Sequence, residues 1–579
     1  MISLGSCGTT APTATRVAPA QPPAPAPKPI AVAPVEPTFT PPAVARAALV
    51  GSLVTVAPNR IVGDLDVLSQ RLKLPMLLGH ELLSSLGGME LIGEKTRFQQ
   101  VWDRLDPTSP IAVVWVLPSE SKARGFCAAL TFRDSAVARR TLDEMGAPGK
   151  QVDGVTLRRS AGGNQIWGGI KGRTLFVSGS AEALLFAGGL AEAAQVSPAR
   201  SQVVLTVLPQ ALATASGKSP DAVVAHLASV MADQAQTMQS KATAAIQRMM
   251  VAMTEAGAKL VMDSTAVHLF LDIGPNDGLV VQAELIPAPG TEFARQAARR
   301  TPYVFDTRLP VPNDRTAVFA LGEWGPLMAR FAKMFEATGP AGHAMWRDMS
   351  KVFEATGEWS CAVDSGEAGV SSLCSSALKP GTNSKAGLDA AVAMLTSQHA
   401  WEAELEGRKL TPLKIKRVSG VVEIEKKIEN KEPTTRAIAK AFAGGDTVKY
   451  ALTVKDGHLL QASSRDAQRT LSRYGTGASM AAAPLLAATL ARTRGDEMMA
   501  SVDVISFALR ILGRGKDLPG NQVAIMAGAT PGLAEMTAPF AFALRGGNSL
   551  VGEFRIPLGS LESVASVLRG FLGDAQPSH

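Results

Sequence analysis

Two stretches of this 579-residue chain repeat the same series of local patterns, which favours folds that use one unit twice. Residues 170–178 predict a turn and an apolar strand, followed by a helix beginning near Ala181. Residues 454–463 predict the same turn and strand, followed by a helix beginning near Asp466. Serines near both helix starts suit an N-cap, because their oxygens accept the free N–H groups of the first turn.

The same order continues downstream of both stretches. Residues 203–208 and 500–505 each predict an apolar strand followed by a helix. A hairpin over 266–287 corresponds to one over 540–557, and both second strands end in Ile-Pro ahead of a helix. Four elements therefore occur twice in one order.

These matches predict two diverged copies of one unit, at about 46–300 and 301–575, with chance recurrence of common elements as the alternative. Strand pairs with short turns alternate with helices of varied length. This pattern favours an α+β fold with antiparallel sheets over a regular β-α alternation. At 46% hydrophobic and 19% charged residues, the chain is long and apolar enough for two sizeable cores.

The first copy is predicted to contain a long helix. Ser219 suits the N-cap and Pro220 the first helical position. The Ala-rich pattern then continues to about Ala256, and Gly257 is placed to end the helix. Its methionines are Met231, Met238, Met249, Met250 and Met253. Such a Met-bearing helix either presents an adaptable binding surface or lies across its own sheet with Met as core filler.

The N-terminal region has the composition of a disordered tether. Residues 9–45 consist almost entirely of Ala, Pro, Thr and Val and hold eleven of the 37 prolines. Such a segment cannot bury enough apolar surface to fold, and its prolines favour an extended polyproline II conformation. We therefore expect residues 8–45 to be a tether.

Residues 4–7 read Leu-Gly-Ser-Cys, which resembles the lipobox of bacterial lipoproteins. The resemblance implies that residues 1–7 are the remnant of a lipoprotein signal and that Cys7 carries a lipid, attaching the protein to a membrane. Gly8 in place of Asp implies sorting to the outer membrane. Only six residues precede Cys7, without the basic and apolar regions of a signal peptide. The alternative is a cytoplasmic protein with a chance cysteine and a disordered tail.

The folded region also resembles large, uncharacterised secreted or lipid-anchored bacterial proteins built from a repeated α+β unit. The resemblance is one of pattern: an apolar strand, a helix with a serine at its start, and a hairpin turned by glycine. It implies no functional residues.

The remaining cysteines are compatible with a protein of the bacterial envelope. Cys361 and Cys374 lie in a predicted hairpin whose turn has flanking glycines. If Gly366 faces Gly369, counting outward places Cys361 opposite Cys374, within reach of a disulfide. Two buried thiols are the alternative. Cys127 lies in an apolar strand and is expected to be a packed thiol.

The sequence contains no complete catalytic, cofactor-binding or metal-binding motif. Residues 212–219 end like a phosphate-binding loop but begin with Leu212, where that loop needs glycine. Ser119 and Lys122 have the spacing of penicillin-recognising enzymes, whose two companion motifs are missing from the chain. The seven histidines are dispersed, and His268 and His458 are expected to be structural strand residues.

Charge gives no sign of a nucleic-acid partner. The net charge is +7, but lysines and glutamates are mixed over 414–429, which predicts a solvated strand face. We expect a non-enzymatic, lipid-anchored envelope protein that binds a protein, a lipid or an envelope polymer, without a cofactor. The alternatives are an envelope hydrolase with dispersed catalytic residues, and a periplasmic carrier or chaperone for apolar ligands.

Overall fold

The computed structural model describes the greater part of one compact unit, Phe39–His579. The described residues are 49–56, 58–74, 77–79, 81, 95–116, 125–152, 155–159, 165–196, 201–237, 244–299, 301–310, 317–323, 332–366, 369–430, 433–476, 484–504, 507 and 539–572. Cys7, the predicted tether 8–45 and the Ser119–Lys122 motif lie outside them.

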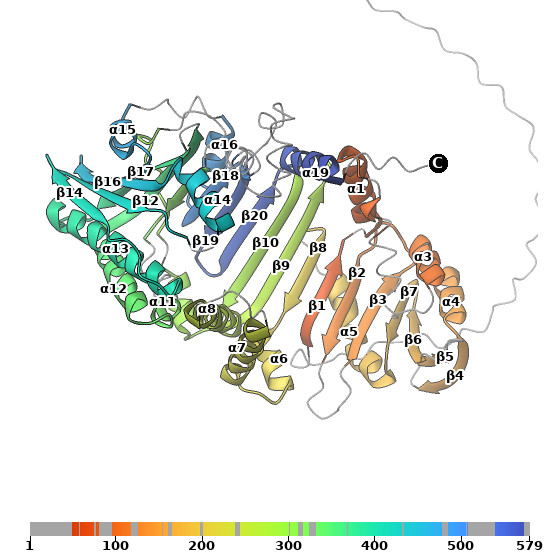
Figure 1. Ribbon diagram of the computed structural model, residues 1–579. Coiled ribbons are helices and arrows are strands. Elements are labelled where there is room, and N and C mark those ends of the chain that lie inside the picture. Colours follow the sequence, from red (N-terminus) through yellow and green to blue (C-terminus); the bar gives the residue numbers. More distant parts are fainter. Residues whose placement is uncertain are drawn as a thin grey trace, which may run out of the picture. The chain divides into compact units, whose positions relative to one another are not determined.

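In the described part of the chain, twenty strands pair in one continuous sheet, and every pair is antiparallel (Figure 1). The strands of the first half are β1 (Leu49–Thr55), β2 (Ile111–Val116), β3 (Gly125–Thr131), β4 (Ala147–Val152), β5 (Val155–Arg159), β6 (Gln165–Lys171), β7 (Thr174–Ser178), β8 (Val203–Val207), β9 (Ser264–Gly274) and β10 (Gly278–Pro287). They lie side by side in the order β4-β5-β6-β7-β3-β2-β1-β8-β9-β10.

The second half has the same strand order. Its strands are β11 (Ala317–Leu321), β12 (Thr356–Gly366), β13 (Gly369–Leu378), β14 (Lys414–Val418), β15 (Val421–Lys427), β16 (Thr447–Lys455), β17 (His458–Ser464), β18 (Met498–Val502), β19 (Phe540–Arg545) and β20 (Leu550–Ile556). They pair as β14-β15-β16-β17-β13-β12-β11-β18-β19-β20. The prediction of an α+β fold with an antiparallel sheet is confirmed.

The halves meet where β10 pairs with β20, from Leu279 opposite Ile556 to Leu285 opposite Leu550. We call this pairing the seam. The strands that were matched within the sequence hold the same positions in the strand order of the two halves. β7 corresponds to β17, β8 to β18, and the hairpin β9–β10 to β19–β20. Descent of the halves from one ancestral unit stays a proposal.

Helices connect many of the strands in both halves. Those of the first half are α1 (Pro58–Arg71), α3 (Lys95–Arg104), α4 (Ser135–Glu144), α5 (Ala181–Val196), α6 (Pro209–Ala215), α7 (Pro220–Thr237), α8 (Ala244–Met262) and α9 (Glu292–Ala297). Those of the second half are α11 (Ala332–Glu336), α12 (Pro340–Ala355), α13 (Ser384–Leu405), α14 (Pro433–Ala443), α15 (Ala467–Ser472), α16 (Pro484–Arg492) and α19 (Leu558–Leu572).

Each half buries a core on both faces of its outer strands. In the first half α4 packs on one face through Leu142, while α5 packs on the other face around Phe176. In the second half α12 and α13 cover the face that holds Leu452, and α15 covers the opposite face with Leu460. The strands near the seam lie between these two covered regions.

The prediction of one long helix ending at Gly257 is wrong. The segment forms two packed helices: α7 ends at Thr237, and α8 begins at Ala244 and continues through Gly257 to Met262. An Ala-rich pattern does not show where one helix ends and the next begins, and glycine inside a helix costs only about 1 kcal/mol relative to alanine. The start is as predicted, since Ser219 Oγ accepts a hydrogen bond from the N–H of Ala222.

The serine cap is confirmed for the first of the two matched helices only. Ser180 Oγ accepts the N–H of Ala183 at the start of α5, at 3.0 Å. At α15 the cap is Asp466, whose carboxylate accepts the N–H of Arg469. Ser464 is the last residue of β17, and its hydroxyl is hydrogen-bonded to Thr470 instead.

Candidate functional site: an apolar face at the centre of the sheet

The central strands present one apolar surface. Because side chains alternate along a strand, directly opposite residues in neighbouring strands share a face. One cross-strand row is Leu205, Leu269, Ala283, Gly552, Leu544, Met498 and Leu321. The next is Val203, Leu271, Val281, Phe554, Phe542, Ala500 and Phe319. We call these two rows the apolar face.

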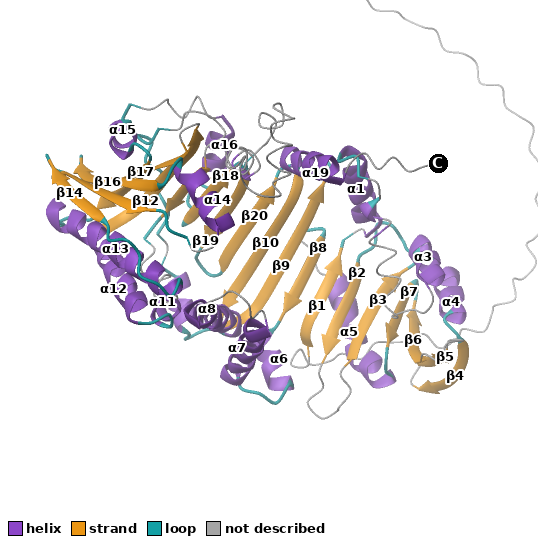
Figure 2. Ribbon diagram, viewed as in Figure 1, coloured by secondary structure: helices purple, strands orange, loops and turns teal. Residues whose placement is uncertain are grey.

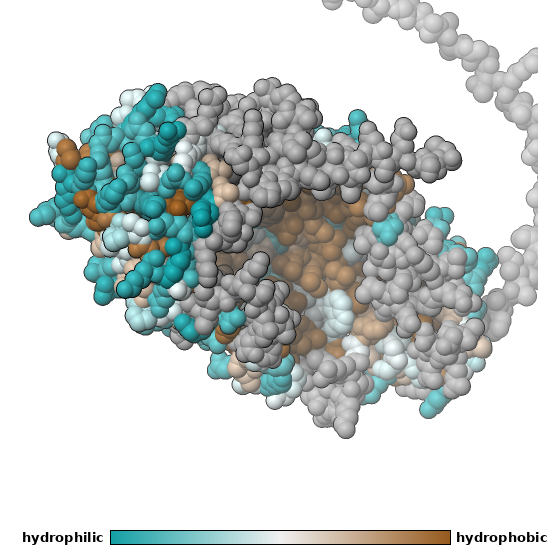
Figure 3. All heavy atoms as spheres, in the orientation of Figure 1, coloured by the Kyte–Doolittle hydropathy of each residue, from teal (hydrophilic) through white to brown (hydrophobic). Residues whose placement is uncertain are grey.

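The apolar face is only partly covered. Leu269 is 41% exposed, and Val281 and Phe554 are each 36% exposed. In Figure 3 the hollow over the central strands is lined by hydrophobic residues. Within the described chain, no residue of the first row belongs to a buried cluster. Large hydrophobic side chains grouped in this way mark an interaction surface more often than scattered ones do.

Helices border the apolar face. Figure 2 shows α1 and α19 at one end of the central strands and α7 and α8 at the other. At the first end, Leu271 and Leu279 pack with Leu68 of α1 and Leu561 of α19. These contacts cover the ends of the strands and leave their middle open.

The opposite face of the same strands is mixed. Near the seam it carries polar side chains among apolar ones such as Phe270: Thr206, His268, Gln282, Glu284, Glu553 and Arg555. Thr206 Oγ1 lies 2.9 Å from Nδ1 of His268, so this histidine takes part in a strand-to-strand hydrogen bond. On β11 and β18 the opposite face is a buried core that includes Val318, Ala320 and Met499. Because hydrophobic sheet faces are ordinarily packed in this way, the exposed residues of the apolar face call for a ligand or a partner.

A cavity of about 380 Å³ continues the apolar face into the second half. The first row extends from Leu321 to Trp359, Ser376 and Leu459, and the second from Phe319 to Cys361, Cys374 and Gln461. These strands form the floor, and α12 and α13 close the cavity with Met349, Val352, Phe353, Ala391 and Met394. Its volume lies in the range of about 300–1,000 Å³ typical of small-molecule sites.

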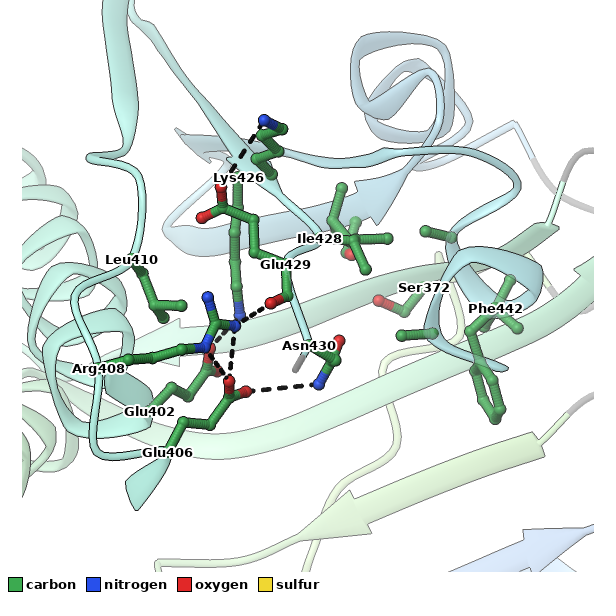
Figure 4. A pocket seen from close by; sticks show the side chains of 16 residues that line it. Ser372, Glu402, Glu406, Arg408, Leu410, Lys426, Ile428, Glu429, Asn430 and Phe442 are labelled. Carbon is green, nitrogen blue, oxygen red and sulfur yellow. Dashed lines mark hydrogen bonds and ion pairs between the residues drawn. The ribbon is translucent and has the colours of Figure 1, made fainter. Parts of the chain in front are cut away.

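A second pocket, of about 490 Å³, lies between α13 and α14 (Figure 4). Its charged groups bind one another: Lys426 pairs with Glu402, and Arg408 pairs with Glu406 at 2.6 Å. Asn430 also donates a hydrogen bond to Glu406. Because these charges are already neutralised inside the protein, the pocket offers less to a charged ligand than the 380 Å³ cavity offers to an apolar one.

The structure brings together Ser375, His458 and Asp306, a grouping that sequence analysis missed. Ser375 Oγ lies 2.6 Å from Oδ2 of Asp306 and 3.0 Å from Nδ1 of His458. Burial raises the pKa of Asp306, but hydrogen bonds from Arg308, Ser375 and Tyr474 outweigh it and hold the pKa well below its ordinary value. Burial, followed by the nearby Arg308, lowers the pKa of His458.

This Asp306 cluster does not have the geometry of a catalytic triad. An ionised carboxylate only accepts, so Ser375 donates its proton to Asp306 and Nδ1 of neutral His458 donates to Ser375. A catalytic histidine instead accepts the serine proton. Ser375 is also only 2% exposed. The cluster therefore anchors a buried carboxylate, and it gives no support to the hydrolase alternative.

The structure places the predicted cysteines in two environments. Gly366 faces Gly369 and Cys361 faces Cys374, as the register predicts, and a disulfide joins the two sulfurs. Formation of this bond in the cell stays a prediction. Cys127 is buried in β3, where burial raises the pKa of its thiol to about 12, so it remains protonated and unreactive at neutral pH.

Other predicted features have structural roles. Residues 212–219 include the end of α6 and the cap of α7, in agreement with a linker rather than a phosphate site. His268 and His458 lie in β9 and β17. Of the five helix methionines, Met249 and Met250 are half-buried and Met253 is exposed on α8, while the side chains of Met231 and Met238 lie outside the described residues.

No group of three or more His, Cys, Asp and Glu side chains in the described part of the chain could hold a metal ion. No helix among the described residues has the length and hydropathy to cross a membrane.

Comparisons with known proteins do not assign a family. No family model and no curated protein matches the chain. One solved structure, titled "Structure of crystal form III of TP0453", is similar at 13% identity and a TM-score of 0.19. The match covers 42% of this chain and 78% of that chain. A TM-score this low supports no inference about fold or function.

Proposed function

We propose that this protein is a non-enzymatic, lipid-anchored protein of the bacterial outer membrane that binds a lipid through the apolar face. The observation that carries the proposal is a pair of hydrophobic rows that cross seven neighbouring strands and are exposed at Leu269, Val281 and Phe554 near the seam. Six strand spacings of about 4.8 Å span about 29 Å. Acyl chains in one leaflet of a bilayer extend about 15 Å, half the hydrocarbon thickness, so the face is long enough for them.

Hydrocarbon suits this face better than an extended peptide does. Every strand of the face has a paired neighbour on both sides, and the sheet's edges are β4 and β14. A peptide therefore cannot add a strand at the face. If it lay flat on the two rows, its backbone N–H and C=O groups would lose water without gaining partners. Acyl chains carry no such groups.

Val281→Lys is expected to weaken binding of the neutral fluorescent probe N-phenyl-1-naphthylamine by at least about tenfold, which corresponds to about 1.4 kcal/mol. The lysine would place a charge in the middle of the second hydrophobic row. Val281 is 36% exposed, so the fold should tolerate the change. Probe fluorescence titrated against the purified protein measures the dissociation constant.

Gln282→Lys is the matched control, because it places the same charge one residue along β10 on the opposite face of the sheet, beside Glu553. It should bind the probe as the wild type does. Equal affinities for all three proteins, or no saturable binding by the wild type, would count against the proposed function.

Attachment through Cys7 is expected to make the protein incorporate a clickable palmitate analogue in a bacterial host when it is expressed behind a full lipoprotein signal peptide. Globomycin, which blocks lipoprotein signal cleavage, should cause the unprocessed form to accumulate, and Cys7→Ser should abolish labelling. Equal labelling of the wild type and Cys7→Ser, or no labelling of either, would contradict the anchor without bearing on the apolar face.

A further inference from the structure

We propose that the cavity beneath α12 and α13 binds an oxygenated amphiphilic carboxylic acid, with its carboxylate at Lys379 and a second oxygen at Ser376 and Gln461. The proposal rests on the proposed function, and it adds the polar chemistry of the ligand. The cavity provides two polar features in an otherwise apolar lining, one at its charged end and one on its floor.

The charged end of the cavity contains one ion pair. Lys379 follows β13, Glu323 follows β11, and their charged groups lie 3.2 Å apart. Both side chains remain partly exposed, at 33% and 47%. An exposed pair of this kind contributes little to stability, so exchanging the glutamate for a ligand carboxylate costs the protein little.

The floor of the cavity contains polar side chains without protein partners. Ser376 is 7% exposed, yet its hydroxyl makes no hydrogen bond within the described chain. The amide of Gln461, on the neighbouring strand, likewise has no bonding partner there. Ser376 is buried, Gln461 is half-buried, and both line the cavity, so a ligand oxygen or a water molecule can reach their polar atoms and hydrogen-bond to them.

The groups that line the cavity define the ligand class. Ser376 precedes Lys379 by three residues along the chain, and Gln461 of β17 lies diagonally across from Ser376. The lining therefore combines a cation at Lys379, neutral hydrogen-bonding groups on the strands, and the hydrocarbon side chains of Met349, Val352 and Met394 on the helices. A hydroxylated fatty acid carries the matching groups: an anion, a hydroxyl and a hydrocarbon chain.

Binding of 3-hydroxytetradecanoate and tetradecanoate to the whole protein, measured by isothermal titration calorimetry, tests the proposal. We expect the hydroxylated acid to bind at least fivefold more tightly, and Ser376→Ala to remove that preference. Lys379→Gln should weaken binding of both acids about tenfold. Glu323→Gln should strengthen binding about threefold, because it frees the lysine.

The two charge variants distinguish ligand binding from a structural ion pair. Both variants break the ion pair between Lys379 and Glu323. If the pair has only a structural role, both variants should change ligand affinity in the same direction, and that result would overturn the proposal. Equal affinity of the wild type for the two acids would also overturn it, since it would leave only water at Ser376. If the neutral probe still binds while neither acid does, the inference fails and the proposed function stands. If neither the probe nor the acids bind, both fail.

Discussion

Asp306→Asn is expected to lower the free energy of unfolding by about 3 kcal/mol, because it leaves several buried donors without their anion. Arg308 donates to the carboxylate through its backbone N–H, Nε and Nη2, and Ser375 and Tyr474 donate their hydroxyl protons. The Asp306 side chain is only 9% exposed. Chemical denaturation at pH 7 measures the loss.

The effect of Asp306→Asn should depend on pH in a defined direction. The folded pKa of Asp306 lies below the ordinary value of 3.8. Its contribution is therefore complete above the unfolded pKa and is lost as the pH falls through the folded pKa. The stability difference between the wild type and the variant should be constant from pH 7 to about 5 and shrink below pH 4. A difference that grows on acidification would contradict this assignment.

Asp364→Asn is a suitable control for this experiment. Asp364 lies in β12 of the same half, and its carboxylate makes no hydrogen bond or ion pair in the described part of the protein. The substitution should change stability by less than about 0.5 kcal/mol. An equal loss in both variants would show that the Asp306 cluster makes no special contribution.

Local features of the fold could be predicted from the sequence because they depend on neighbouring residues. The hairpin that pairs Gly366 with Gly369 sets the register for Cys361 and Cys374, so counting along two strands was sufficient. The start of α7 was equally local, since Ser219 and Pro220 form its cap and first residue. Both predictions needed no knowledge of distant contacts.

Features that depend on distant contacts could not be predicted in this way. Asp306 and His458 are 152 residues apart, and two separate long-range contacts form the cluster: β13 pairs with β17, which brings Ser375 to His458, and Asp306 reaches Ser375 from the segment before β11. The hairpin predicted over 266–287 exists as β9 and β10, and β9 places Leu269 and Leu271 on the same side. A hairpin pattern does not show that helices cover this face in the outer strands and leave it open near the seam. That outcome depends on where every helix packs.

Gly278→Ala is expected to lower the free energy of unfolding by about 2–5 kcal/mol, through backbone strain and a clash at the seam. Gly278 has a φ of +87°, which alanine adopts only at a cost. The added Cβ would also lie 2.1 Å from the carbonyl oxygen of Ile556 and 2.7 Å from the N of Leu558. All these atoms are backbone, so β10 and β20 would have to move apart. Chemical denaturation measures the loss.

Gly172→Ala separates the two causes, because Gly172 has a φ of +58° and nothing within 4 Å of an added Cβ. It should lower the free energy of unfolding by only about 1–2 kcal/mol, because backbone strain is the single cause at this position. Since Val281 and Phe554 face each other across the seam, Gly278→Ala should also weaken binding of the neutral probe, whereas Gly172→Ala should not. Equal stability losses in the two variants, with probe binding unchanged, would mean that the seam tolerates a wider spacing. The apolar face would then not depend on the contact between the two halves.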